Sequence, residues 1–293
     1  MKFKFKKIAI IGRHNASSVA KTLRSVIDYL QKKKIKVFLE RDTANIIPNC
    51  NVPILPQEKL KNICDLIVVV GGDGSLLSAS QIAACQNIPI IGINRGNLGF
   101  LTDISPNNFS QIDEILLGNF HQEYRFLLEM RLEPQKHNHN KKIALNDIVL
   151  LPASMGHMIE FSVYVDQNFL CNYRSDGLII ATPTGSTAHA LSSGGPILYP
   201  TIENIVLVPI LSHNLSSRPI VISNKSEIQI ICNKTKINNN LLILYDGQSQ
   251  PLTQLSSIFI KKAKEKLSLL HPINYNYFTI LRTKLHWEKE QSN

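Results

Sequence analysis

The sequence predicts an α/β domain followed by an all-β domain. Up to about Leu117, short apolar runs alternate with helical patterns, which is typical of a parallel sheet with crossover helices. Beyond that point, many short strand-like segments are separated by polar turns, which favours an all-β domain. The chain has 293 residues, enough for two hydrophobic cores.

The first elements of the α/β domain are predicted at the amino-terminal end. Residues 6–12 read as a strand, residues 17–33 as an amphipathic helix and residues 36–40 as a second strand. Residues 42–56 contain three prolines and are predicted to be a loop. This order of elements is the start of a strand–helix–strand unit, whose crossover is expected to be right-handed.

Residues 66–70 form the most apolar strand candidate in this domain. All five are apolar and four are β-branched, which indicates a strand that is buried on both faces. A helix is predicted from Leu76 to Cys85, and residues 89–93 read as the next strand. The parallel sheet therefore continues through this region.

A glycine-rich loop, Gly71-Gly72-Asp73-Gly74-Ser75, joins that strand to that helix. Glycines allow backbone N–H groups to approach phosphate oxygens, and the helix begins with the positive end of its dipole. A carboxylate there can accept a proton from an attacking hydroxyl or hold Mg²⁺. The alternative is that Asp73 or Ser75 only caps the helix. A second glycine loop, residues 94–100, follows the next strand, so the two loops are expected to share a crevice.

The second domain is read from strand-like segments between polar turns. They lie at residues 123–133, 143–151, 159–165, 169–173, 206–210, 219–222, 227–232, 240–246 and 257–262. The apolar and aromatic residues 275–285 are predicted to form a helix. We expect residues 1–120, together with a carboxyl-terminal helix in 275–293, to form the α/β domain, and residues 121–274 to form the β-rich domain.

Composition excludes several classes of protein. The net charge is +10, but the lysines are dispersed and no basic helix carries interleaved aromatic residues, so we expect no nucleic-acid partner. No apolar run is long enough for a membrane span. The five cysteines are scattered without a paired spacing, which indicates reduced thiols and a cytoplasmic location.

A second polar motif runs from Arg174 to His189. A strand at residues 177–181 ends in Thr-Pro-Thr-Gly-Ser-Thr, and a helix is expected to begin at Gly185 or Ser186. The hydroxyl groups can cap this helix and can also bind a ligand. The alternative is that these hydroxyl groups only cap the helix, but the density of small polar residues favours a ligand site.

These motifs, together with Leu145-Asn146-Asp147, resemble those of the bacterial ATP-dependent NAD kinases over nearly the whole chain. Lipid kinases of the diacylglycerol type share the Gly-Gly-Asp-Gly motif but lack the other two. The resemblance implies a two-domain NAD kinase fold with a Rossmann-like, phosphofructokinase-like first domain. It also implies transfer of the γ-phosphoryl group of ATP to the 2′-hydroxyl of the adenosine ribose of NAD, which gives NADP.

The resemblance assigns roles to residues of both motifs. Asp73 would deprotonate the ribose hydroxyl, and Gly74 would lie against the substrate. Asn146 and Asp147 would hold the NAD ribose. The remaining expected substrate contacts are Phe100, His157, Arg174, Asp176, Thr187, Ala188, His189, Ala190, Leu191, Ser192 and Gln248.

Two of these assignments carry a further expectation. Asp176 would complete the site of a neighbouring subunit, and His189 stands where the family commonly has Tyr. The resemblance implies a homotetramer or homodimer whose small-molecule partners are NAD and ATP. It also implies Mg²⁺ or another divalent cation with ATP, although the sequence identifies no metal ligand. A lipid or sugar kinase, a non-catalytic NAD-binding regulator and a nucleic-acid-binding role remain as alternatives.

Overall fold

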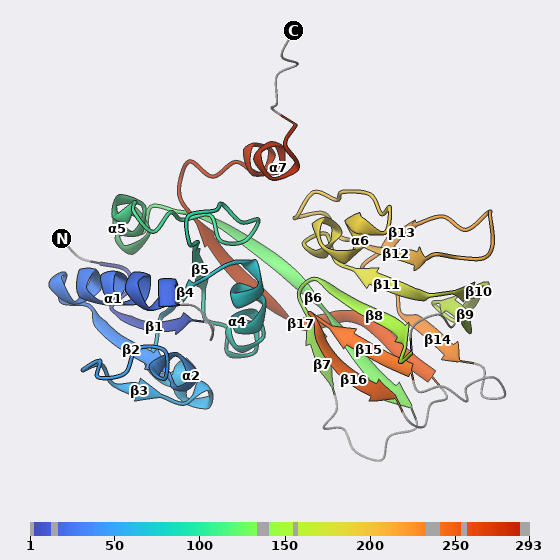
Figure 1. Cartoon of the computed structure of the whole chain (residues 1–293), viewed down its shortest axis with the longest axis horizontal. Coiled ribbons are helices and arrows are strands. Elements are labelled where there is room, and N and C mark those ends of the chain that lie inside the picture. The colour runs from blue at the N-terminus through green and yellow to red at the C-terminus, as the bar shows by residue number, and fades with distance from the viewer. Residues whose placement is uncertain are drawn as a thin grey trace, which may run out of the picture. The chain divides into compact units, whose positions relative to one another are not determined.

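The computed structural model divides the chain into two compact units. The first unit comprises residues 1–124 and 267–293, and the second comprises residues 125–266. Strands β6 (His121–Glu133) and β17 (Ser257–His271) each have residues in both units (Figure 1). The described residues are 3–12, 17–133, 141–154, 158–232, 241–252 and 257–287.

The first unit contains a parallel sheet. Its strand order is β17-β5-β4-β1-β2-β3, and β17 joins through Leu269, which lies opposite Ile90. The strands are β1 (Lys7–Gly12), β2 (Lys36–Glu40), β3 (Ile54–Leu55), β4 (Leu66–Val70) and β5 (Ile90–Ile93). All five residues of β4 are buried, so the predicted strand with two covered faces is confirmed.

Helices of the first unit follow the strands. The longer ones are α1 (Ser17–Lys32), α4 (Asp73–Gln86), α5 (Phe109–Leu117) and α7 (Tyr277–Leu285). Single turns are α2 (Arg41–Ala44), α3 (Leu60–Ile63) and a 3₁₀ turn at Gln57–Lys59. Apolar side chains from α1, α5 and the sheet form one buried core, which holds the carboxyl ends of the strands in fixed positions.

The predicted loop at residues 42–56 is wrong in part, because it contains most of α2 and all of β3. The buried Glu40 carboxylate accepts the backbone N–H groups of Asp42 and Thr43 and caps α2. Glu is not among the usual capping residues, so this turn could not be predicted from local residue preferences. Strand β3 is held by pairing with β2, where Leu39 lies opposite Ile54.

The second unit is built from two antiparallel sheets. One has the order β10-β9-β14-β17, with β6 paired to β17 and β7 paired to β6, and the other has the order β13-β12-β11-β8-β15-β16. Its further strands are β7 (Lys142–Ala144), β8 (Asp147–Pro152), β9 (Ile159–Val165), β10 (Asn168–Ser175), β11 (Gly177–Ala181), β12 (Asn204–Ile210), β13 (Ile220–Ser223), β14 (Ile228–Cys232), β15 (Leu241–Tyr245) and β16 (Gln248–Leu252). Side chains of both sheets, including Ile148, Leu178, Val163 and Ile230, share one core.

Three predicted elements, two in the second unit and one in the first, differ from the structure. Residues 143–151 form two strands, β7 and β8, with a break at Leu145 and Asn146. The helix expected to begin at Gly185 or Ser186 is a 3₁₀ turn, Gly185–Thr187, followed by one turn of α6 (His189–Ser192). In the first unit, α4 begins at Asp73 rather than Leu76. Over the described part of the chain, no helix is both long and apolar enough to span a membrane.

Candidate active site

Asp73 lies at the amino-terminal end of α4, directly after β4. Gly72 precedes the helix and offers no capping side chain, so the first helical N–H groups are open to a ligand. The Asp73 carboxylate accepts the backbone N–H groups of Phe100 (2.9 Å), Leu101 (3.0 Å) and Thr102 (3.1 Å). It also accepts the Thr102 hydroxyl at 3.1 Å. The predicted proximity of the two glycine loops is therefore confirmed.

Gly99 permits this close approach. A Cβ at position 99 would overlap the Asp73 carboxylate and the Thr102 hydroxyl. The start of the same loop is shaped by Asn94, whose side-chain oxygen accepts the N–H of Gly96 at 2.8 Å. The orientation of Asp73 is thus fixed by the backbone of a neighbouring loop.

The two loops border a cavity of about 290 Å³ in the first unit. Among the described residues that line it, Asp73 is the one carboxylate, and Arg95 and Lys284 are the cations. Its other lining residues are Gly72, Asn97, Leu98, Gly99 and Thr102. Gly74, next to Asp73 in α4, is half-buried, as is Phe100. The arrangement offers backbone N–H groups and two cations around a single carboxylate.

A buried charged cluster lies behind the second loop. His271, at the end of β17, is fully buried, and its Nδ1 lies 2.7 Å from Oδ2 of Asp103, the residue after Thr102. Its Nε2 lies 3.7 Å from Oε2 of Glu123, and its ring stacks on Tyr275 at 3.7 Å. This cluster ties β17 to the loop that orients Asp73. Sequence reasoning missed it, because its members are far apart along the chain.

In the second unit, Asp246 holds the turn that carries Asn146 and Asp147. Its carboxylate accepts the N–H groups of Leu145 and Asn146, both at 2.7 Å. Its own N–H donates to the carbonyl oxygen of Asp147 at 3.2 Å. Burial raises the pKa of Asp246 to about 6, despite the N–H groups that oppose this shift. Asp246 is a positioning residue that sequence reasoning did not single out.

Asn146 and Asp147 present buried acceptor oxygens. Asp147 is 1% exposed, and its Oδ1 lies 3.3 Å from Nδ1 of His189. Its Oδ2 and the Oδ1 of Asn146 are buried without a hydrogen-bond partner. The hydrogen bond to Asp147 raises the pKa of His189. Because buried acceptors normally have donors, these two oxygens are suited to hydroxyl groups of a ligand.

The Thr-Pro-Thr-Gly-Ser-Thr turn packs directly on this pair. The Thr182 hydroxyl donates to the carbonyl oxygen of Leu145 at 2.5 Å and accepts the N–H of Gly185 at 3.1 Å. A Cβ at Gly185 would overlap the backbone of Asn146. The turn leads into α6, so His189 is brought to Asp147. The structure therefore places residues 187–189, the start of a run of expected substrate contacts, beside the predicted ribose-binding pair.

Two family models match the chain. A model described as the ATP-NAD kinase N-terminal domain matches residues 8–124, and one described as the ATP-NAD kinase C-terminal domain matches residues 145–271. The chain belongs to the NAD kinase family. The NAD kinases of Teredinibacter turnerae and Legionella pneumophila (strain Corby) are each 46% identical to it, over 99% of both chains. The sequence similarity extends over nearly the whole chain and identifies this enzyme as an NAD kinase.

Solved structures of related kinases share the two-domain fold. Yeast NADH kinase in complex with NADH matches with a TM-score of 0.85 at 23% identity, covering 98% of this chain and 89% of that one. An NAD kinase from Archaeoglobus fulgidus in complex with ATP matches with a TM-score of 0.72 at 27% identity, covering 94% of this chain and 99% of that one. The predicted α/β domain followed by a sheet-rich domain is thus the NAD kinase fold.

Arg174 and Asp176 lie apart from Asn146 and Asp147, the predicted ribose-binding pair. Asp147 is opposite Ala181 at one end of β11, whereas Asp176 precedes Gly177 at the other end. Strands rise about 3.3 Å per residue, so roughly 17 Å of strand separates the two positions. Within one chain, these groups do not meet.

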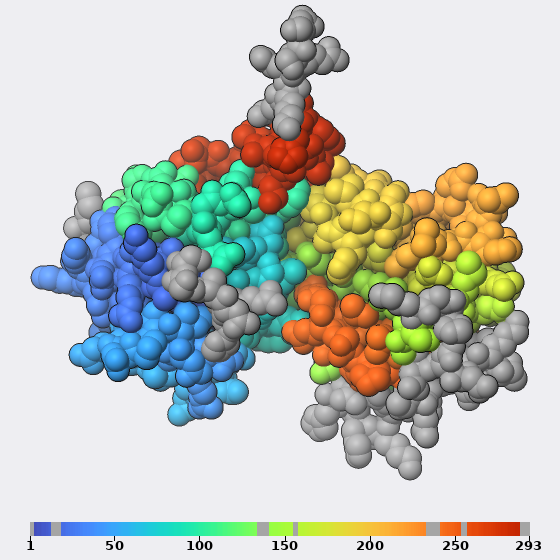
Figure 2. All heavy atoms as spheres, in the orientation of Figure 1, coloured from blue at the N-terminus to red at the C-terminus, as the bar shows by residue number. Residues whose placement is uncertain are grey.

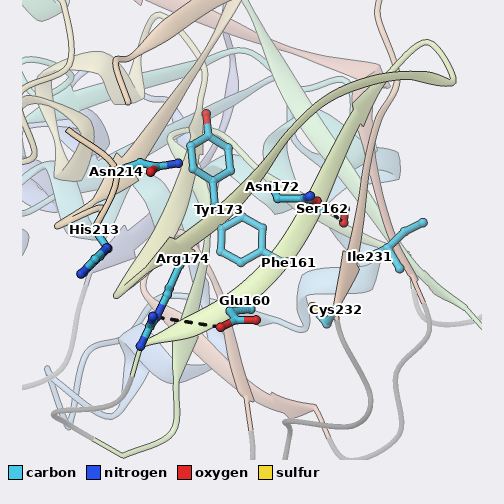
Figure 3. Close-up of a pocket in the computed structure, with 10 residues that line it drawn as sticks. All are labelled: Glu160, Phe161, Ser162, Asn172, Tyr173, Arg174, His213, Asn214, Ile231 and Cys232. Atoms are coloured by element: carbon cyan, nitrogen blue, oxygen red, sulfur yellow. Dashed lines mark hydrogen bonds and ion pairs between the residues drawn. The ribbon is translucent and has the colours of Figure 1, made fainter. Parts of the chain in front are cut away.

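Arg174 lines a second cavity, of about 420 Å³, in the second unit (Figure 3). The Arg174 guanidinium lies 3.9 Å from the Glu160 carboxylate, and its backbone carbonyl accepts the N–H of His213 at 2.9 Å. The rings of Phe161 and Tyr173 lie beside them (Figure 3). The cavity is thus formed by β9, β10 and neighbouring segments.

Other expected contacts of the NAD kinase are placed as follows. Gln248 is exposed at the start of β16, opposite Tyr245. His157 lies outside the described residues. Across the described ranges, no group of three or more His, Cys, Asp or Glu side chains is arranged to hold a metal ion.

Proposed function

We propose that this NAD kinase transfers the γ-phosphoryl group of ATP to the 2′-hydroxyl of the adenosine ribose of NAD and so forms NADP. The observation that carries the proposal is Asp73, a single oriented carboxylate in a cavity with cations and a helix amino terminus. Transfer to an alcohol requires positioning, charge neutralisation and an acceptor for the hydroxyl proton. Asp73 is that acceptor.

The orientation of Asp73 supports this role. Three backbone N–H groups and one hydroxyl fix its carboxylate, so little reorganisation is needed when the substrate hydroxyl arrives. Gly74 and Phe100 lie next to these groups in the sequence and are the proposed neighbours of the substrate. The proton would move from the ribose 2′-oxygen to a carboxylate oxygen of Asp73.

Asn146 and Asp147 bind the ribose hydroxyls of NAD in this proposal. Their two partnerless buried oxygens accept hydrogen bonds from vicinal hydroxyls, which removes the cost of leaving these acceptors unsatisfied. The proposed adenosine contacts follow in the adjoining turn and one-turn helix. They are Thr187, Ala188, His189, Ala190, Leu191 and Ser192. Gln248 and His157 are proposed as further polar contacts.

A divalent cation, Mg²⁺, is proposed to enter with ATP. Mg²⁺ is commonly held by one or two carboxylates together with substrate phosphates, and the cavity offers one carboxylate, Asp73. The residues present therefore fit the ion. When bound, it neutralises charge on the phosphates.

A homo-oligomer with a shared site is proposed from the position of Asp176. Arg174 and Asp176 lie at the end of β11 remote from Asp147, so they are proposed to reach the NAD of a neighbouring subunit in a dimer or a tetramer. A cytoplasmic location is proposed because all five cysteines are free.

The test is NADP formation from ATP and NAD, with and without Mg²⁺, by the wild type and by Asp73→Asn. An amide cannot accept the proton, so we expect kcat to fall about 10²–10⁴-fold, while NAD affinity measured by calorimetry stays close to wild type. Asp42→Asn, at an exposed position, is the matched control. Near wild-type kcat in Asp73→Asn would refute the proton-acceptor role.

A further inference from the structure

The cavity beside Asp73 contains two cations without an assigned role. Arg95 comes from the loop after β5, and Lys284 comes from α7, far along the chain. Both line the same cavity as Gly72 and Asp73. Within the described ranges, neither cation is ion-paired with a carboxylate. Two uncompensated cations therefore border a site that holds one carboxylate.

Lys284 is directed by the packing of α7. The buried residues of this helix are Tyr277, Ile280 and Leu281, which recur at helical spacing and define the packed face. Lys284 is four residues after Ile280 and three after Leu281, so it lies on the same face. Asn276 caps the helix by accepting the N–H of Thr279 at 3.1 Å. The lysine thus occupies a position where an amphipathic helix usually carries an apolar residue.

Figure 2 shows the carboxyl-terminal part of the first unit, in red, at the molecular surface. The side chains of Lys284 and Arg95 are both exposed. Both side chains are therefore accessible to a ligand that enters the cavity from solvent.

We propose that Lys284 and Arg95 bind the polyphosphate chain of the phosphoryl donor. The ligand class is a linear polyphosphate, free or attached to a nucleoside, because the open N–H groups at the start of α4 and the two cations are all donors to phosphate oxygens. Lys284 supplies a point charge and Arg95 a planar set of donors. This assignment rests on the proposed function for the identity of the donor, but polyphosphate binding itself does not require turnover.

The test measures binding without catalysis. Calorimetry with inorganic tripolyphosphate, Mg-ATP, adenosine and NAD is done on the wild type, Lys284→Met, Lys284→Arg and Arg95→Met. We expect tripolyphosphate and ATP affinities to fall about 10- to 100-fold in each Met variant. Lys284→Arg should recover most of the loss, and adenosine and NAD affinities should not change. Lys36→Met, which removes an exposed lysine from β2, controls for net charge.

The outcomes separate this inference from the proposed function. Unchanged tripolyphosphate affinity in Lys284→Met and Arg95→Met overturns the inference, even if the wild type makes NADP. An equal loss in Lys36→Met also overturns it, because the effect is then one of general charge. Selective loss in the two cavity variants supports it, and does so even if the wild type forms no NADP, a result that would refute the proposed function alone.

Discussion

Asp246 shows how a buried side chain can fix the backbone of a predicted binding site. Its carboxylate is bound to two consecutive N–H groups, so the backbone at Leu145 and Asn146 is drawn away from strand pairing. The side chains of Asn146 and Asp147 are thereby set at the end of β8. Sequence reasoning found this pair through its motif, but not its support, because the supporting residue is about 100 positions away.

The pKa of Asp246 gives a prediction for stability. Burial raises it from 3.8 to about 6, so the folded state favours the protonated form. The contribution to stability is present below about pH 4 and is lost as pH rises through 6. Relative to Asp246→Asn, the wild type should lose roughly 1–3 kcal/mol of unfolding free energy between pH 4 and pH 7. Denaturant titrations at several pH values measure this, with Asp28→Asn as an exposed control. A pH-independent difference would contradict it.

His189 gives a prediction for a local titration. Its pKa is raised by the hydrogen bond to Asp147, so the stabilising pair is present below pH 6.5 and is lost as pH rises through the raised value. The ring is 59% exposed, and solvent screening keeps the effect on stability small. We expect the His189 pKa, measured by NMR, to fall toward 6.5 in Asp147→Asn. An unchanged titration would exclude this contact.

At the scale of elements, strands that consist of apolar or alternating residues could be predicted. The break between β7 and β8 and the short strand β3 could not. Strand β4 follows from five consecutive apolar residues, and the strands of the second unit follow from their alternation. The break between β7 and β8 is set by Asp246, and β3 exists because β2 pairs with it. Each depends on a distant partner rather than on local propensity. The proximity of the two glycine loops could be predicted because they follow neighbouring parallel strands. Lys284 and His271 were missed because they are far along the chain from Asp73.

Gly185 connects two elements at the predicted ribose site. Because a Cβ there would overlap the Asn146 backbone, Gly185→Ala should push the turn after β11 away from β8. We expect a loss of about 1–3 kcal/mol of stability, together with weaker NAD binding. Thermal unfolding and calorimetry measure the two effects, with Ser193→Ala as a control. If Gly185→Ala bound NAD and unfolded like the wild type, the inferred close contact between this turn and the Asn146 backbone would be contradicted.

At the scale of the whole molecule, the separation of Asp176 from Asp147 predicts complementation between subunits. Asp73→Asn and Asp176→Ala should each be inactive alone. A mixture should recover part of the activity, because some sites then combine a wild-type Asp73 with a neighbour's wild-type Asp176. Exchange of labelled subunits confirms that mixed oligomers form. A fully active monomer by light scattering would refute the shared site.

The first unit is discontinuous in sequence, and this has a consequence for synthesis on the ribosome. Its sheet includes Leu269 of β17, and its helices include α7, both of which are translated after all of residues 125–266. Domains near the amino terminus generally fold first. Here all residues of the second unit are translated before the first unit is complete. At that stage the first unit still lacks Leu269 in its sheet and Lys284 in the cavity beside Asp73. A chain that ends at Lys266 and has been released from the ribosome should therefore resist protease in its second unit and be cleaved in its first.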